Sequence, residues 1–368
     1  MMQMRKKMSR MAAWMLAAIL VYMAPAAALD VSAHSAVLMD GDSGQVIWEK
    51  NSNEKSLIAS TTKIMTALVV LEQTELSDIV EVAAEAVGVE GSSMYLKAGE
   101  KLTVEDLLYG LMLSSGNDAA VALAMYVAGS PEAFAELMNE KAQALSLQNT
   151  HFANPNGLDS EENYATARSL GILTAAAMEN DDFRTIVSSK TYSCAGHSMT
   201  NHNKLLWQYD GAVGVKTGFT KHAGRILVGC AEKNDRRLIS VTINAPSDWN
   251  DHKQMLDYGF SCYSEKTLVS AGDTVGNLPV ISGVSEQVPL VAEREIIWNM
   301  LSEELPELRL ETEPFVYAPV SQGQELGTLK VYVGSRLVGE TPVIAGESVE
   351  QLPEEPGFWD RLLERFSA

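Results

Sequence analysis

An apolar run over residues 64–71, led by a serine and a lysine, most constrains how this chain folds. Apolar side chains recur in the run at intervals of three and four residues, so it predicts a buried helix. Ser60 then lies at or near the start of that helix, and Lys63 lies one turn further along the same face. The same stretch therefore carries a core element and two reactive side chains.

This pair of side chains suits nucleophilic catalysis. A serine hydroxyl is inert at neutral pH unless a neighbouring base removes its proton, and a lysine is such a base when burial and nearby cations lower its pKa. The N–H groups at a helix N-terminus can stabilise a developing oxyanion. An isolated Ser-x-x-Lys match is common by chance, so the alternative is an ordinary N-cap serine beside a solvated lysine.

The first 28 residues have the pattern of a secretory signal peptide. Four basic residues precede an apolar stretch from Met11 to Met23, and Ala26-Ala27-Ala28 provides a small-residue cleavage site. An uncleaved N-terminal anchor is the alternative, although the apolar stretch is shorter than the roughly 20 residues that a span needs. Either way we expect an exported protein that works at the outer face of the cytoplasmic membrane or in the cell wall space.

Composition excludes several classes of function. The chain is 46% hydrophobic and 21% charged, as in ordinary globular proteins, and 28 basic against 48 acidic residues give a net charge of −20. Such a protein should avoid nucleic acid. No zinc-type Cys/His spacing and no phosphate-binding glycine loop occurs, so no metal site is indicated. The scattered Cys194, Cys230 and Cys262 allow at most one disulfide, and we expect free thiols.

Helices between an opening hairpin and a closing set of strands predict an α+β domain, with one sheet built from both ends. The expected elements are strands at 35–39 and 45–49, helices at 103–126, 131–145 and 164–179, strand character after 185, strands at 213–220, 225–231 and 237–244, and a helix at 249–258. A polar break at 114–117 interrupts the first of these helices.

The sequence pattern changes near residue 263. From there short predicted strands alternate with glycine turns, as in a small all-β domain. A linker rich in Glu and Pro follows at Val349 to Gly357, and five large apolar residues after it fall on one helical face: Phe358, Trp359, Leu362, Leu363 and Phe366. We expect this tail helix to lie on a membrane surface, with docking on its own protein as the alternative.

The predicted segments are a signal peptide at 1–28, a catalytic domain at 29–262, a β-rich domain at 263–345, and a linker with a tail helix at 346–368.

Three short signatures occur in order: Ser60-x-x-Lys63, Ser115-x-Asn117 and Lys216-Thr217-Gly218. Each is weak alone, and a chance Lys-Thr-Gly is more often an exposed turn. The second falls in the break between two apolar helical pieces, and the third falls in a strand. In this order and setting they match the set typical of serine β-lactamases and penicillin-binding proteins.

The chemistry gives each of the first four residues a task. Ser60 attacks a carbonyl carbon and becomes the acyl-enzyme, while Lys63 takes the hydroxyl proton. Ser115 can hydrogen-bond Lys63 and relay a proton to the leaving amine. Asn117 can tether Lys63 and the amide of the substrate.

The third signature is expected to bind the substrate. Lys216 is a second cation near the base, which favours a neutral amine there. Thr217 offers a hydroxyl to a substrate carboxylate, and Gly218 lets the acyl chain lie against the strand. The backbone N–H groups of Ser60 and Phe219 form the expected oxyanion hole.

The chain resembles the low-molecular-mass penicillin-binding proteins of the serine D-alanyl-D-alanine carboxypeptidase family. The resemblance covers nearly all of about 30–345 and includes longer matches at Ser115 to Ala120, Asn154 to Leu158, Asn203 to Leu206 and Leu256 to Phe260.

That resemblance implies a penicillin-recognising catalytic domain of antiparallel sheet and helices, a β-rich second domain and a C-terminal amphipathic membrane anchor. It also implies removal of the terminal D-alanine from peptidoglycan pentapeptide stems, inhibition by β-lactams, and no metal or cofactor. One departure concerns the substrate carboxylate, because some members carry an arginine just before an Asn-x-Leu-Leu stretch. Here that position is His202, which we expect at this contact, with Lys204 two residues on.

Two alternatives stay open from the sequence. A class A-like β-lactamase shares the three signatures but needs a further glutamate that activates water, and no convincing Glu-x-x-Leu-Asn loop lies between the second and third signatures. A non-catalytic cell-wall-binding relative would keep the fold, although the intact reactive residues argue against a decayed site.

Overall fold

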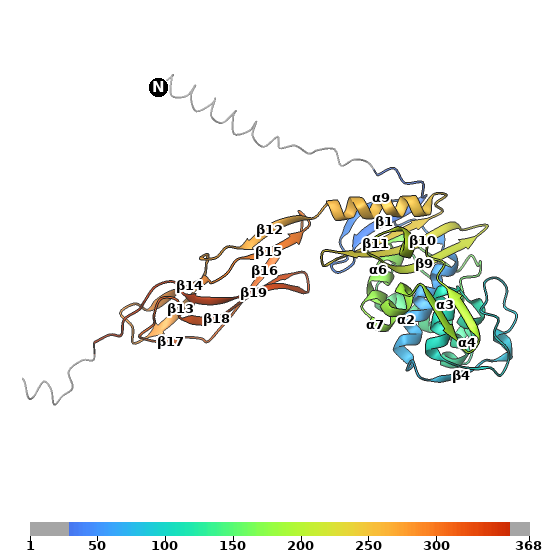
Figure 1. Ribbon diagram of the computed structural model, residues 1–368, viewed down its shortest axis with the longest axis horizontal. Coiled ribbons are helices and arrows are strands. Elements are labelled where there is room, and N and C mark those ends of the chain that lie inside the picture. Colours follow the sequence, from blue (N-terminus) through green and yellow to red (C-terminus); the bar gives the residue numbers. More distant parts are fainter. Residues whose placement is uncertain (1–28, 354–368) are drawn as a thin grey trace, which may run out of the picture.

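The computed structural model describes residues 29–353 and shows a domain of helices packed on a sheet, followed by an elongated all-β domain (Figure 1). The predicted signal peptide and the predicted tail helix lie outside the described residues.

Five antiparallel strands form the sheet of the first domain, in the order β2-β1-β11-β10-β9. They are β1 (Ser35–Asp40), β2 (Val46–Lys50), β9 (Ala212–Thr220), β10 (Gly224–Lys233) and β11 (Arg236–Ile243). The opening hairpin therefore pairs with the closing strands, which confirms the predicted α+β fold.

The sheet is the middle layer of three, because helices cover both of its faces. On β1, Val37 and Met39 pack into the core shared with the main group of helices, whereas Ala36 and Leu38 pack with α9 (Asp248–Ser261). All six residues of β1 are consequently buried. This explains why its sequence is apolar on both faces.

Helix α2 (Lys63–Gln73) is the central helix of the first domain, and Ile64 to Val70 are all buried, as the apolar run predicts. A 3₁₀ turn, η1 (Ala59–Thr62), leads directly into it. The helices around it are α3 (Val104–Leu113), α4 (Asn117–Ala128), α5 (Pro131–Ala144), α6 (Ala167–Met178) and α7 (Asp181–Ser188).

Short elements connect these helices and strands. They are β3 (Ser56–Leu57) paired with β6 (Tyr164–Ala165), β4 (Ile79–Glu81) paired with β5 (Lys101–Thr103), β7 (Thr191–Cys194) paired with β8 (His197–Thr200), η2 (Ala84–Ala86) and α8 (Leu205–Gln208).

Helix α7 differs from the strand character expected after residue 185. The Asn180 side chain caps its start by accepting a hydrogen bond from the Phe183 N–H, and Asp181 and Asp182 favour the positive end of the helix dipole. Phe183, with Ile186 and Val187 one turn on, is buried. The cap signal was present in the sequence, but the β-branched residues at 185–187 masked it.

The second domain contains a six-stranded sheet in the order β16-β18-β19-β14-β13-β17 and a separate pair, β12 with β15. Its strands are β12 (Ser264–Val269), β13 (Thr274–Ile281), β14 (Gln287–Ala292), β15 (Ile296–Met300), β16 (Pro306–Thr312), β17 (Val316–Tyr317), β18 (Glu325–Val333) and β19 (Arg336–Ala345). The all-β class predicted for this domain is confirmed.

The predicted linker begins inside this domain. Val349 is buried and exchanges two backbone hydrogen bonds with Val320, and Gln351 forms a bridge to Gly283. Proline and glutamate after it suggested an extended segment, but an extended segment also pairs readily with a sheet edge. The rest of that linker, from residue 354, lies outside the described residues.

A buried arginine joins the two domains. Arg236, at the start of β11, is 3% exposed and pairs with Glu304 at 3.1 Å, while its Nε donates to the Asn299 carbonyl at 2.8 Å. Its guanidinium also lies 3.8 Å from Asp40, which accepts a 2.5 Å hydrogen bond from the Tyr263 hydroxyl. The charge is thus paired on both sides, as burial of an ion requires.

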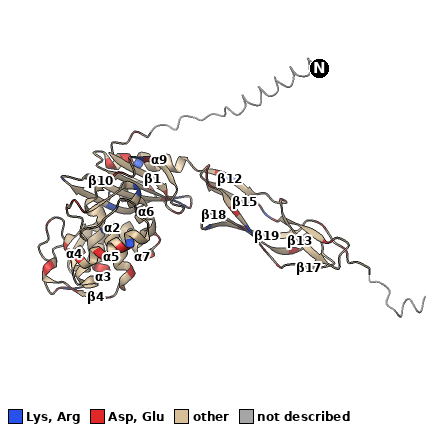
Figure 2. Cartoon of the chain, turned by 180° about the vertical axis from the view of Figure 1, so that it is seen from behind, with Lys and Arg blue, Asp and Glu red and all other residues tan. Residues whose placement is uncertain are grey.

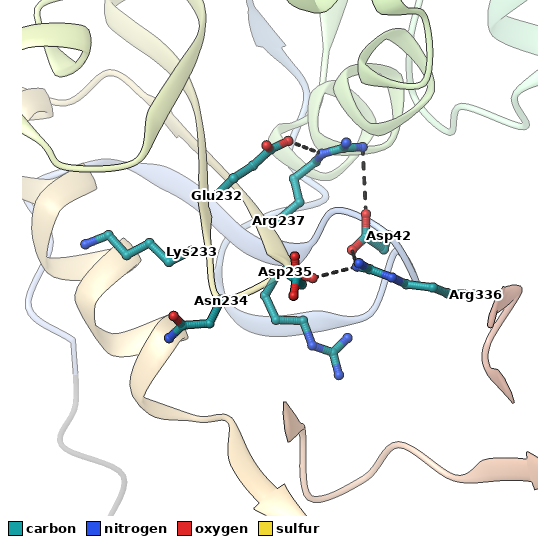
Figure 3. Close-up of a pocket in the computed structure, with 8 residues that line it drawn as sticks. Asp42, Glu232, Lys233, Asn234, Asp235, Arg237 and Arg336 are labelled. Atoms are coloured by element: carbon teal, nitrogen blue, oxygen red, sulfur yellow. Dashed lines mark hydrogen bonds and ion pairs between the residues drawn. The ribbon is translucent and has the colours of Figure 1, made fainter. Parts of the chain in front are cut away.

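A second arginine extends this junction toward the surface (Figure 3). Arg336, in β19, pairs with Asp42 of the hairpin turn at 3.1 Å, and Asp42 also lies 3.7 Å from Arg237. Burial, then the charge of Asp40, raises the pKa of Asp42 above its ordinary value in spite of these arginines. Two charge pairs therefore cross between the domains, Arg236 with Glu304 and Arg336 with Asp42.

Arg236→Ala should destabilise the protein by about 3–5 kcal/mol, because Asp40 and Glu304 would remain buried without their cation. Urea unfolding measures the loss. Arg294→Ala is the matched control, since Arg294 is 69% exposed in its pair with Glu293 and its removal should change little. Equal losses for the two variants would mean that the buried pair does not hold the junction.

Candidate active site

Ser60 lies in the 3₁₀ turn that leads into α2, near the start of the helix as the sequence predicts but two residues before its N-cap. The N-cap residue is Thr62, and no side-chain cap bond is formed there. The turn is tight, since Ala59 has a φ of +45° and Thr61 Oγ1 donates to the Ile58 carbonyl at 2.5 Å. The Ser60 hydroxyl is therefore not engaged in capping and lines a cleft.

Lys63 lies directly beneath Ser60 and is 0% exposed. Its Nζ is 3.1 Å from Ser60 Oγ and 2.7 Å from Asn117 Oδ1, and it also contacts the backbone carbonyl of Asn156. Burial, then the positive charge of Lys216, holds the pKa of Lys63 well below its ordinary value of 10.5. The neutral amine is thus far more accessible than in a free lysine.

The partners of Lys63 determine where its lone pair points. A neutral amine has two N–H donors and one acceptor lone pair. The Asn156 carbonyl can only accept, and the Asn117 amide is oriented by its Nδ2, which donates to the Glu90 carbonyl at 2.5 Å. Both N–H donors are then used on these two oxygens. In the neutral form of Lys63, the lone pair is then left for Ser60, whose hydroxyl can donate a proton to it.

Ser115 lies in the break between α3 and α4, with a φ of +59° and only 4% of its surface exposed. It lines the same cleft as Ser60. The hydrogen bond that the sequence suggests between Ser115 and Lys63 is not formed among residues 29–353. The three partners already on Nζ explain why.

The third signature lies on β9, the edge strand of the sheet. Lys216 is 1% exposed, its Nζ donates to the Thr217 carbonyl at 3.1 Å, and burial lowers its pKa to about 7. A Cβ at Gly218 would lie 3.3 Å from the Ile58 carbonyl, so glycine permits close approach of the nucleophile turn. Phe219 follows at the rim and is 65% exposed.

A cleft of about 350 Å³ brings together the hydroxyls of Ser60, Ser115 and Thr217. Lys63, Asn117 and Lys216 are buried and do not line it. The other lining residues are Gly218, Phe219, His202, Ser92, Lys204, Arg225, Ile226, Asp248 and Trp249. The residues of the three signatures therefore lie around a single cleft, some at its surface and some buried next to it.

His202 also lines the cleft, and burial, then the charge of Lys216, lowers its pKa below 6.5. The side chain is therefore mostly neutral at pH 7.

Arg225 is a cleft residue that the sequence did not indicate. Its Nε and Nη2 donate hydrogen bonds to the buried Asp248 carboxylate at 3.1 and 2.8 Å. It is paired with Phe219 across the two strands, and Thr217 is paired with Leu227, so Arg225 and Thr217 are diagonal neighbours on one face. An arginine in a β-branched run reads as an ordinary solvent-facing residue, so no local pattern marks it.

The loop from Asn154 to Leu158 holds the nucleophile turn from the other side. The Pro155 carbonyl accepts from Thr66 Oγ1 at 2.6 Å, and Asn154 Oδ1 accepts from the Gly157 N–H at 2.7 Å. Gly157 has a φ of +84°, and a Cβ there would lie 2.0 Å from the Ala59 carbonyl oxygen. The sequence marked this loop only by resemblance and gave it no task.

Gly157→Ala should slow acylation by roughly a hundredfold, because the loop would have to move away from the turn and take the Asn156 carbonyl off Lys63. Stopped-flow labelling with a penicillin measures the rate. Gly129→Ala is the matched control, with a φ of +78° and no atom within 4 Å of the added Cβ. Both variants carry the same backbone strain, so equal acylation rates would show that the loop does not position Lys63.

No group of three or more metal-ligating side chains occurs within the part of the chain that the structure describes.

Comparison with known proteins identifies two matching family models. Residues 22–247 match the model described as D-alanyl-D-alanine carboxypeptidase, and residues 263–351 match that of the C-terminal domain of penicillin-binding protein 5.

Individual proteins match over most of the chain. The D-alanyl-D-alanine carboxypeptidase DacF of Bacillus subtilis is 34% identical, covering 87% of this chain and 86% of its own. The carboxypeptidase DacC of Escherichia coli is 36% identical over 91% and 89%. The crystal structure of penicillin-binding protein 5 from Haemophilus influenzae superposes with a TM-score of 0.64 at 29% identity, covering 88% of this chain and 98% of that one.

Proposed function

The chain belongs to the D-alanyl-D-alanine carboxypeptidase family, and from this premise we propose how its own residues carry out the reaction. The protein is a serine-type carboxypeptidase that removes the terminal D-alanine from peptidoglycan stems. A β-lactamase or a non-catalytic binder is not favoured. The observation that carries the proposed mechanism is the fully buried Lys63 amine, whose Nζ lies 3.1 Å from Ser60 Oγ.

Acylation begins with Ser60. Its Oγ attacks the carbonyl carbon of the penultimate D-alanine while Lys63 takes the hydroxyl proton. The carbonyl oxygen becomes an oxyanion, which the backbone N–H groups of Ser60 and Phe219 stabilise. Collapse of this intermediate breaks the peptide bond and leaves an ester on Ser60. Water then hydrolyses the ester and restores the hydroxyl.

The departing D-alanine needs a proton on its amine. Lys63 holds the proton taken from Ser60, and the Ser115 hydroxyl lines the same cleft without a hydrogen bond to another described side chain. Ser115 is therefore proposed to pass the proton to the leaving nitrogen once substrate brings the groups together. Asn117 keeps the amine of Lys63 in place at 2.7 Å.

The substrate ends in a carboxylate, which we assign to the part of the cleft beside Thr217. His202, the residue expected at this contact, is mostly neutral near pH 7 and alone is a poor partner for an anion. Arg225 carries a guanidinium group, and because Asp248 holds its Nε and Nη2, its Nη1 is the nitrogen left for another partner. The proposed anchor is the Thr217 hydroxyl with Arg225, and His202 donates or accepts a neutral hydrogen bond.

We also propose export, with residues 1–28 as the signal peptide, and a peripheral membrane contact through residues 358–366. The support is the sequence pattern and the action of the family on the cell wall. Within residues 29–353, none of the helices is both long and apolar enough to span a bilayer.

Ser60→Ala should lower D-alanine release by more than about a thousandfold, because the acyl-enzyme cannot form. Release is measured on a diacetyl-lysyl-D-alanyl-D-alanine peptide, and covalent labelling by a fluorescent penicillin is measured in parallel. Ser92→Ala, at another serine of the cleft, is the control and should keep labelling. A stable penicillin adduct on the Ser60 variant would place the nucleophile elsewhere.

The acylation rate should fall as the pH is lowered, because Lys63 then becomes protonated and can no longer take the proton of Ser60. Lys216→Met should move this acid limb to higher pH, since removing the neighbouring positive charge raises the pKa of Lys63. The penicillin acylation rate against pH measures the shift. Lys204→Met, at an exposed lysine of the cleft, should leave the limb in place, and an unmoved limb in both variants would contradict the electrostatic coupling.

A further inference from the structure

The end of the β domain that carries β13 and β17 lies remote from the catalytic domain (Figure 1). We call this end the distal tip and define it by Ile281, Val284, Phe315, Tyr317 and Leu352, which are between 41% and 65% exposed. They come from three chain segments, so local sequence did not reveal them as one surface.

Strand pairing brings these side chains together. Ile281 is aligned with Tyr317 in the parallel pair of β13 and β17, and the rings of Tyr317 and Phe315 are 5.4 Å apart in an edge-to-face arrangement. The Val284 N–H donates to the Glu350 carbonyl, and the Leu352 N–H donates to the Ser282 carbonyl, each at 2.9 Å. The tip is therefore an apolar surface whose three chain segments are joined by backbone hydrogen bonds.

The paired backbone matters for the kind of partner. A surface that enters an apolar medium must have its N–H and C=O groups satisfied, because each unpaired group costs free energy there. Besides the two bonds above, the Ala318 N–H donates to the Ile281 carbonyl at 3.0 Å, and Val280 donates to Glu286 at 2.8 Å. The backbone of the tip can thus leave water with little polar cost.

The chain leaves the described structure at the same place. Pro353 directly follows Leu352 of the tip, and the apolar stripe of the tail begins five residues later at Phe358. A surface that receives the stripe is therefore within reach of the tip as well. Figure 1 shows the active-site domain at the opposite end of the molecule.

We propose that the distal tip is a second lipid contact, in which the folded β domain itself rests on a neutral or zwitterionic membrane surface. It rests on the membrane contact proposed above for residues 358–366 and adds a surface of the folded protein to it. Aromatic and aliphatic side chains at a rigid tip suit the interfacial region, where apolar burial supplies the binding.

Charge selects the kind of lipid. The tip segments, 281–286, 313–320 and 347–353, contain Glu286, Glu313, Glu347 and Glu350 and no lysine or arginine. Figure 2 likewise shows little blue on this end of the β domain. Anionic lipid should therefore repel the tip, and salt should relieve the repulsion.

Two other partners for the distal tip, a second copy of the protein and the apolar stripe of its own tail, fit less well. Five side chains are too few for a stable interface with a second copy, which needs on the order of 1,000 Å² of buried area, and two acidic tips would repel each other. The apolar stripe of the same chain would have to reverse direction within the four residues that separate Pro353 from Phe358. A lipid surface needs neither shape complementarity nor a turn.

The test is partitioning of residues 29–368 onto phosphatidylcholine vesicles by flotation. Phe315→Ser with Tyr317→Ser should lower the partition coefficient roughly tenfold, since burying about 60 Å² of apolar surface corresponds to a tenfold change. Leu305→Ser with Leu308→Ser is the matched control, because these leucines are 83% and 47% exposed. Leu305 directly precedes β16 and Leu308 lies in it, and β16 is the edge strand opposite β17.

Two further comparisons separate this proposal from the one for the tail. Trp359→Ser with Phe366→Ser tests the tail alone, so loss in the tip variant with no loss in the tail variant would leave only the tip proposal standing. Adding phosphatidylglycerol should weaken binding at low salt and restore it at high salt. Three results would overturn the lipid contact. They are equal partitioning of the tip and control variants, no flotation of the parent chain, and a dimer of the parent chain that the tip substitutions dissociate.

Discussion

A buried amine is the interaction on which the catalytic domain depends. Lys63 is enclosed by the nucleophile turn, the Asn154–Leu158 loop and α4, and its Nζ touches a group from each. Removing an ammonium from water is costly, so burial by itself pushes this side chain toward the neutral form. The packing around Lys63 thereby lowers the pKa of its amine. The same elements that exclude water from the amine also place it beside the Ser60 hydroxyl.

Much of this arrangement could be predicted from the sequence, because it is encoded in local patterns. The apolar run of α2, the capping box of α3 formed by Thr103 and Asp106, and the hairpin at the start all follow from spacing and turn chemistry. The three signatures meet at one cleft from the turn before α2, the break between α3 and α4, and the interior of β9.

The rest depends on contacts between distant residues, which no local pattern marks. Arg225 and Asp248 lie on different elements, and Asn156 acts through its backbone carbonyl, which every residue possesses. The 3₁₀ turn that carries Ser60 packs closely against Gly157, almost a hundred positions away. Arg236 at the junction likewise finds Glu304 only once both domains are folded.

Strand β9 is an open edge of its sheet, with β10 on one side and the cleft on the other. An open edge pairs with any extended backbone, and main-chain hydrogen bonds carry no information about side chains. Backbone pairing at this edge therefore does not by itself distinguish a stem peptide from another compact amide that mimics a strand. Discrimination between a true substrate and an impostor must come after the covalent bond has formed, in whether water can reach the ester. A substrate and an inhibitor that both acylate Ser60 would then differ in the lifetime of the acyl-enzyme that each forms.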